Sequence, residues 1–143
     1  VSGLSLGGGS VYPLVFNPAV RDDRVTAMIA MSAVGLVSFG GEVSDLSRPF
    51  PTLVFAGDAD RTVPYQVQRD TWSQLAGPTW LVTLHDGAHS PPYEDSVDAH
   101  DQLVIDTSID FWGAFLRDDA TARSRITTDG NVDGLASVES RTA

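Results

Sequence analysis

Three short apolar runs limit what this chain can fold into. They span residues 25–33 (VTAMIAMSA), 49–57 (PFPTLVFAG) and 79–84 (TWLVTL). Each run has about the length of a strand and lacks the polar alternation of a strand with one wet face, so we expect both faces to be covered. Residues 65–76 have helical character, and apolar residues recur at helical spacings over 96–116. Strands that alternate with helices predict an α/β fold with a mostly parallel sheet flanked by helices.

The two ends of the chain extend this pattern. Residues 1–4 are expected to be the last residues of a buried strand, and residues 11–16 to form a short helix packed on the sheet. From Arg117 onward the composition turns polar and small. We therefore predict a domain over residues 1–117 and a tail over residues 118–143 that holds a short helix and loose ends.

The composition argues against several classes of function. The chain has 143 residues, of which 42% are hydrophobic and 20% charged, as in a globular protein. Its 19 acidic and 9 basic residues give a net charge of -10, which repels phosphate backbones and argues against nucleic-acid binding. No apolar run approaches the roughly 18 residues of a membrane span. The absence of cysteine rules out a disulfide, a thiolate metal site and a cysteine nucleophile; we predict neither a metal nor a cofactor.

The glycine-rich segment after the first predicted strand carries a motif with a chemical meaning. Residues 3–7 (GLSLG) match the pattern G-x-S-x-G, in which a serine stands at the tip of a sharp strand-to-helix turn. The flanking glycines avoid a collision of side chains, and the N–H group of Leu6 would point at an oxyanion formed beside Ser5. The same residues could instead be a plain glycine-rich turn or a phosphate-binding loop, although the latter lacks both the P-loop lysine and the G-x-G-x-x-G spacing.

A serine nucleophile needs a base, and the chain has three histidines. His100 lies among aspartates in the predicted amphipathic helix, which favours a solvated surface residue. His85 directly extends the strand at 79–84, which favours packing. His89 stands in the loop beyond that strand, after Gly87 and Ala88, where it can lean over the edge at which α/β sheets bind ligands. We therefore favour His89.

The third member of such a site is a carboxylate that orients the histidine. Asp58 and Asp60 both follow the strand that ends at Gly57. Asp58 could simply cap the turn, whereas Asp60 stands farther out, where the loop can return toward His89; two acids in a plain turn would be the default without Ser5 and His89. The resulting order of serine, aspartate and histidine, each at the end of a separate predicted strand, is the chain order of α/β hydrolases.

Four segments then resemble the C-terminal half of a bacterial α/β-hydrolase-fold serine esterase, on the dienelactone hydrolase, chlorophyllase and polyester hydrolase side of that superfamily. They are GLSLGGG, PTLVFAGDADRTVPY, HDGAHSPPYED and IDFWGAFLRDD, and the resemblance covers most of residues 1–119. It implies that Asp60, the second acid of its segment, is the triad aspartate, and it supports His89. Because dienelactone hydrolases themselves use cysteine, Ser5 points to the esterase branches.

The resemblance also implies that part of the family's fold is not in this sequence. In the family, several strands precede the serine turn, and one of their loops supplies the second oxyanion N–H group. We therefore expect residues 1–117 to be a partial α/β-hydrolase domain without its N-terminal strands, and this fragment alone to be poorly active.

The expected reaction is hydrolysis of a small or polymeric carboxylic ester through an acyl-enzyme on Ser5. Three rivals remain: a serine peptidase of the prolyl-oligopeptidase type, an acyltransferase, and a catalytically silent binding domain. Leu36, Val37 and Phe39 could line an acyl pocket or tuck onto the body of the protein, and Tyr93 is the one aromatic residue we place near the site.

Overall fold

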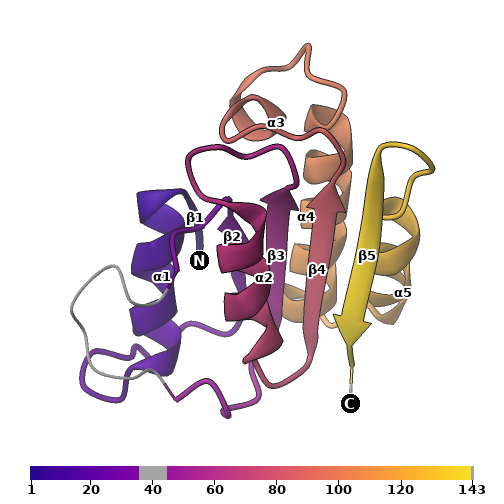
Figure 1. The fold of residues 1–143 in the computed structure, drawn as a ribbon. Coiled ribbons are helices and arrows are strands. Elements are labelled where there is room, and N and C mark those ends of the chain that lie inside the picture. The colour runs from indigo at the N-terminus through magenta and orange to yellow at the C-terminus, as the bar shows by residue number, and fades with distance from the viewer. Residues whose placement is uncertain (36–44, 143) are drawn as a thin grey trace.

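The sheet at the centre of the molecule is mostly parallel, as the apolar runs predict. The computed structural model describes residues 1–35 and 45–142, and within them five strands pair in the order β1-β2-β3-β4-β5 (Figure 1). Their bounds are β1 Ser2–Leu4, β2 Met28–Met31, β3 Thr52–Gly57, β4 Thr79–Leu84 and β5 Ala136–Arg141. The first four strands run parallel to one another, and β5 runs antiparallel to β4. The carboxyl ends of β1 to β4 therefore lie along one edge of the sheet.

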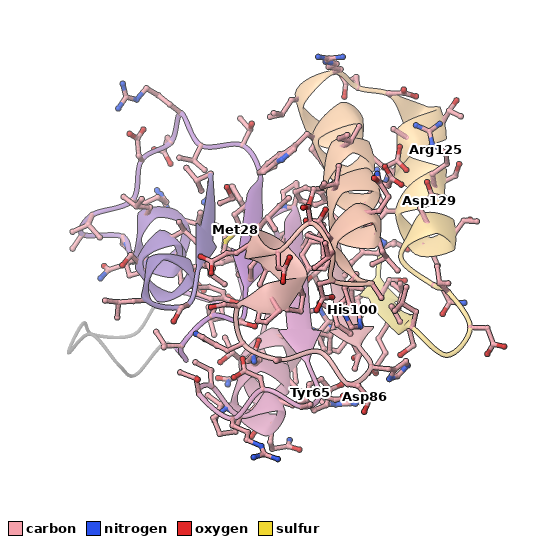
Figure 2. All side chains as sticks on the ribbon, turned by 90° about the horizontal axis from the view of Figure 1, so that it is seen from above. Met28, Tyr65, Asp86, His100, Arg125 and Asp129 are labelled. Carbon is pink, nitrogen blue, oxygen red and sulfur yellow. The ribbon has the colours of Figure 1, made fainter. Side chains whose placement is uncertain are left out.

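Helices cover both faces of this sheet. Their bounds are α1 Leu6–Phe16, α2 Tyr65–Ser73, α3 Pro91–Glu94, α4 Asp101–Leu116 and α5 Ala120–Asp129. Apolar residues of α1 and α2 pack on one face, and those of α4 and α5 pack on the other (Figure 2). None of the helices in the described part of the chain is long and apolar enough to cross a membrane.

Strand β3 explains why the runs are apolar without alternation. Leu53 and Phe55 point into the core under α4 and α5, while Val54 and Ala56 point into the core under α1 and α2. All four side chains are buried. Because each face of the strand has a helical layer above it, apolar residues stabilise every position.

Two helices begin at other residues than the sequence predicts. α1 begins at Leu6 rather than at residue 11, so the glycine-rich segment is helical. Packing on the sheet overrides the low helix propensity of glycine here. α4 begins at Asp101 rather than at residue 96, because the carboxylates of Asp95 and Asp98 accept the N–H groups two residues ahead and hold the preceding segment in turns.

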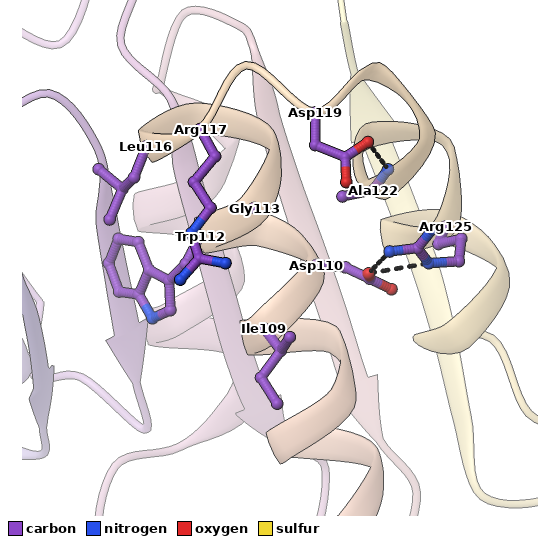
Figure 3. Close-up of a pocket in the computed structure, with 9 residues that line it drawn as sticks. All are labelled: Ile109, Asp110, Trp112, Gly113, Leu116, Arg117, Asp119, Ala122 and Arg125. Atoms are coloured by element: carbon purple, nitrogen blue, oxygen red, sulfur yellow. Dashed lines mark hydrogen bonds and ion pairs between the residues drawn. The ribbon is translucent and has the colours of Figure 1, made fainter.

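The predicted loose ends of the tail are wrong for residues 136–141. These residues form β5, which pairs with all six residues of β4. α5 packs on α4, where Asp110 accepts a bond from Arg125 Nε at 2.9 Å (Figure 3). The composition of β5 is polar because an edge strand is only partly covered, and this polarity conceals the strand in the sequence.

β1 lies at the opposite edge of the sheet from β5. We expected it to be buried, but its residues are exposed or half-buried. Among the described residues, β1 pairs with β2 alone, and α1 lies on one of its faces. The strand that leads into Ser5 is nevertheless fixed in register, with Gly3 opposite Ala30 and Leu4 opposite Met31.

Candidate active site

Ser5 stands at the tip of the turn between β1 and α1. Its φ of 56° and ψ of -118° lie outside the regions that an L-residue ordinarily adopts. The Ser5 N–H group donates to the Met31 carbonyl at 2.9 Å, and the Ser5 carbonyl accepts the Gly9 N–H group at 3.0 Å. Strain of this kind at a polar residue persists because the surrounding structure fixes it, and it is concentrated at functional sites.

The motif predicts that a side chain at either flanking glycine would collide with its neighbours. This holds at Gly3 but not at Gly7. A Cβ atom on Gly3 would overlap the Gly7 carbonyl, and one on Gly8 would come within 2.6 Å of Ala33 Cβ. Helix α1 thus packs against β1 and against Ala33, which follows β2, more closely than a side chain on these glycines allows. At Gly7 an added Cβ would meet nothing within 4 Å. The expected collision at that position is absent because Gly7 faces outward from the first helical turn.

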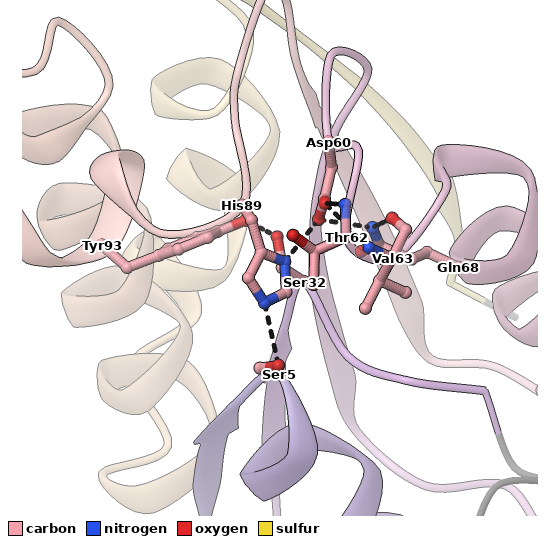
Figure 4. A network of polar contacts seen from close by, with 8 residues as sticks. All are labelled: Ser5, Ser32, Asp60, Thr62, Val63, Gln68, His89 and Tyr93. Carbon is pink, nitrogen blue, oxygen red and sulfur yellow. Dashed lines mark hydrogen bonds and ion pairs between the residues drawn. The ribbon is translucent and has the colours of Figure 1, made fainter.

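The three residues singled out in the sequence lie in one hydrogen-bonded row (Figure 4). His89 Nε2 is 2.8 Å from Ser5 Oγ, and His89 Nδ1 is 2.8 Å from Asp60 Oδ2. Ser5 follows β1, Asp60 follows β3 and His89 follows β4, so the parallel strands carry all three to the same edge of the sheet. The loops after β3 and β4 also contact each other directly, since the Ala59 N–H group donates to the Gly87 carbonyl at 3.1 Å.

Hydrogen bonds to both oxygens fix the carboxylate of Asp60. Its Oδ1 accepts the N–H groups of Thr62 at 2.8 Å and Val63 at 2.9 Å, in an Asx-type turn. Gln68 Nε2 lies 3.4 Å from Oδ2, and the carboxylate has no exposed surface. Burial alone would raise the pKa of Asp60, but the bonds from His89, Val63 and Thr62 outweigh it, so the pKa lies below its ordinary value.

An ionised Asp60 fixes the proton arrangement of a neutral His89. A carboxylate only accepts hydrogen bonds, so Nδ1 must carry the ring proton and donate it to Asp60. Nε2 is then an acceptor, and the Ser5 hydroxyl donates to it. The row can therefore move the serine proton to His89 while Asp60 stabilises the imidazolium that forms.

The backbone of Leu6 adjoins this row at the start of α1. The first N–H groups of a helix have no acceptor within the helix, and they carry the positive end of its dipole. Leu6 is the first residue of α1, and its side chain is exposed. The arrangement therefore offers an N–H donor beside Ser5 for a developing negative charge.

The alternative histidines and acid have other roles. His85 Nδ1 lies 3.1 Å from Asp58 Oδ2 in an exposed pair, so the expected packing of His85 is not seen. Asp58 Oδ1 accepts the Asp86 N–H group at 2.7 Å and so caps the turn after β4. His100 is buried, and the expectation of a solvated residue is wrong, because its two ring nitrogens bond Asp98 Oδ1 and the His85 carbonyl.

Two further residues support the site, and the sequence-based prediction does not include them. Gln68 lies on the buried face of α2 beside Thr71 and Trp72. A polar residue on the buried face of a helix is visible in the sequence and indicates a buried polar contact. Ser32 is fully buried and bonds the Tyr93 hydroxyl at 3.0 Å. Tyr93, which we expected near the site, lies beside His89 in Figure 4.

A shallow hollow of about 410 Å³ adjoins the row of three residues. Its lining residues come from the loops after β3 and β4 and from the start of α3: Ala59, Arg61, Thr62, Ala88, His89, Ser90 and Pro91. A second hollow of about 470 Å³ lies over α4 and α5, remote from the three residues (Figure 3). The candidate pocket residues Leu36, Val37 and Phe39 lie outside the described residues.

Within the described residues, no group of three or more histidine, aspartate or glutamate side chains is placed to hold a metal ion. No protein-family model matches the chain, and no curated protein matches it. The case for a function therefore depends on the geometry of the site.

Proposed function

We propose that this chain carries the catalytic residues of a serine hydrolase that cleaves carboxylic esters. One observation carries the proposal: a serine in a strained strand-to-helix turn lies 2.8 Å from a histidine, whose other nitrogen lies 2.8 Å from a buried, ionised aspartate. Nucleophile, base and orienting acid in one row are the requirements of acyl transfer through serine.

In the proposed reaction, Ser5 Oγ attacks the ester carbonyl carbon while His89 Nε2 takes the serine proton. The carbonyl oxygen becomes an oxyanion, which the Leu6 N–H group stabilises. His89 then donates its proton to the leaving alcohol, and the acyl group stays on Ser5. Water, activated by His89, attacks the acyl-enzyme; the acid leaves and Ser5 regains its proton.

The finer fold assignment is part of the same proposal. The sheet has parallel strands, and the serine, aspartate and histidine follow three of them in that chain order. This order is that of the α/β hydrolases and differs from those of the chymotrypsin and subtilisin types. We therefore propose that residues 1–117 belong to an α/β-hydrolase domain of the serine esterase branches.

Labelling with a fluorophosphonate tests the nucleophile in the native protein. We expect the reagent to modify Ser5, and the Ser5→Ala variant to lose both labelling and hydrolysis of 4-nitrophenyl butyrate. Ser10→Ala is the matched control, because Ser10 is an exposed serine on the same helix whose hydroxyl bonds the Leu6 carbonyl. A full-length native protein that does not label at Ser5 would refute the proposal in favour of a silent binding domain.

Substrate comparison separates the rival reactions. Turnover of 4-nitrophenyl acyl esters well above that of peptide 4-nitroanilides supports an esterase, and the reverse supports a peptidase. An acyltransferase would give the transesterified product when an alcohol acceptor is added, whereas an esterase yields mainly the free acid.

A further inference from the structure

The carboxyl end of β2 contacts the segments that carry all three residues of the proposed site. The Met31 carbonyl accepts the Ser5 N–H group at 2.9 Å, and the Ser32 N–H group donates to the Phe55 carbonyl of β3 at 2.9 Å. The Ser32 side chain bonds the Tyr93 hydroxyl at 3.0 Å (Figure 4). Met31 and Ser32 thus contact three segments: the turn that holds Ser5, strand β3 before Asp60, and the segment after His89.

Ser32 makes this contact from a backbone conformation that is costly for a residue with a side chain. Its φ is 40°, in the left-handed region that non-glycine residues avoid, and it is fully buried. A buried hydroxyl needs a partner, and the partner here is Tyr93, which is 61 residues away in the sequence. Burial raises the pKa of the Tyr93 hydroxyl above its ordinary value, so it stays protonated and keeps the bond.

Tyr93 is coupled to His89 by a short and stiff stretch of chain. Only three residues separate them, and two of these are prolines, Pro91 and Pro92, whose φ angles are fixed. The Tyr93 N–H group also donates to the Ser90 carbonyl at 2.9 Å, which closes the turn. The other end of the loop is tied to the Asp60 loop through Ala59 and Gly87. Anchoring Tyr93 therefore restricts where the imidazole of His89 can lie.

We propose that Tyr93 and Ser32 are positioning residues, whose paired hydroxyls hold His89 Nε2 within hydrogen-bond distance of Ser5 Oγ. The inference depends on the proposed function, since it concerns the same reaction. Neither hydroxyl has to touch substrate. Their effect arises because a small displacement of a catalytic base lowers the rate steeply; about 1 Å can cost roughly 100-fold.

Tyr93→Phe removes the contact and retains the ring. We expect kcat for 4-nitrophenyl butyrate to fall about tenfold with KM changed less than twofold, because the base is displaced and the binding surface is kept. Tyr65→Phe is the matched control: its hydroxyl bonds Thr83 Oγ1 at 2.9 Å on another part of the sheet. We expect the control to keep the full kcat.

A double-mutant cycle distinguishes positioning from general stability. In a His89→Ala background, Tyr93→Phe should leave the residual rate unchanged, because there is no imidazole left to position. Ser32→Ala should lower kcat as much as Tyr93→Phe does, and the two changes together should cost no more than either one. Tyr93→Phe should also shift and broaden the NMR signals of the His89 ring, and Tyr65→Phe should not.

The outcomes distinguish the two proposals. Absence of both Ser5 labelling and ester hydrolysis in the full-length, unmodified protein refutes the proposed function itself. If the unmodified protein is active and Tyr93→Phe matches Tyr65→Phe in kcat, the positioning role is overturned. It is also overturned if Tyr93→Phe lowers the residual rate equally in the His89→Ala background, because the loss would then be structural.

Discussion

Two histidine–aspartate pairs of this protein have nearly the same geometry and different surroundings. His89 Nδ1 lies 2.8 Å from Asp60 Oδ2, and His100 Nδ1 lies 2.7 Å from Asp98 Oδ1. At Nε2 the two histidines differ: His89 faces the Ser5 hydroxyl at 2.8 Å, while His100 faces the carbonyl oxygen of His85 at 2.9 Å. A hydroxyl can donate a proton, and a carbonyl can only accept a hydrogen bond.

This difference decides what each ring can do. Both ring nitrogens of His100 face acceptor oxygens, so neither lies beside a group that could give it a proton. His89 has one acceptor and one donor as neighbours and can take a proton at Nε2. A paired carboxylate is therefore insufficient to identify a catalytic histidine, and the partner of the second nitrogen identifies it.

The largest expected effect is on the histidine that faces serine. His89→Ala should lower ester hydrolysis by about 10⁴-fold or more, since loss of the base in a serine triad costs up to about 10⁶-fold in kcat. His85→Ala, at the exposed pair with Asp58, should stay within twofold of the unmodified protein. Both rates are measured with 4-nitrophenyl butyrate, and equal losses in the two variants would contradict the assignment.

The acid partners should differ in the same way. Asp60→Asn keeps the shape of the side chain but allows the wrong tautomer of His89, which costs about 10⁴-fold in kcat in such triads. Asp98→Asn should leave the rate per folded molecule unchanged, because His100 takes no part in the chemistry. Fluorophosphonate labelling rates measure both, and a rapid Asp60→Asn enzyme would exclude Asp60 as the orienting acid.

The sequence predicts much of the sheet and of the candidate site because the site residues follow the ends of strands. β4 has the predicted bounds, and β3 lies within its apolar run, since a covered strand needs apolar side chains on both faces. Ser5, Asp60 and His89 each follow a strand, so parallel pairing alone brings them to one edge. Their hydrogen bonds could not be read from the sequence, because they depend on loop conformations.

The sequence-based predictions fail where a residue's partner lies far away in the chain. The prediction of a solvated His100 is wrong because the His85 carbonyl, which binds its second ring nitrogen, lies 15 residues earlier in a segment that local periodicity does not relate to it. β5 was missed because its partner β4 lies more than 50 residues earlier in the chain and its exposed positions are polar. The hydroxyl pair of Ser32 and Tyr93 likewise joins distant segments. Contacts of this kind are decided by tertiary packing.

A smaller effect, on stability rather than rate, is expected at the second pair. His100→Ala removes the hydrogen bonds that the buried ring makes to Asp98 and to the His85 carbonyl, which costs about 1–3 kcal/mol. The Tm should fall by several degrees in a protein of this size. His100→Gln, which retains one donor, should lose less. Calorimetry measures both, and a variant with unchanged Tm would show that the buried ring contributes nothing.

The smallest effect is the pH dependence of stability at Asp60. Because the pKa of folded Asp60 lies below its value in the unfolded chain, about 3.9, the ionised carboxylate adds stability that is fully present above that value. This stability is lost as the pH falls through the folded pKa. The Tm difference between the unmodified protein and Asp60→Asn should therefore be constant above about pH 5 and shrink below about pH 4. A Tm difference for Asp60→Asn that widens on acidification would mean that the protonated acid is the form the fold prefers, and the tautomer inferred for His89 would then be wrong.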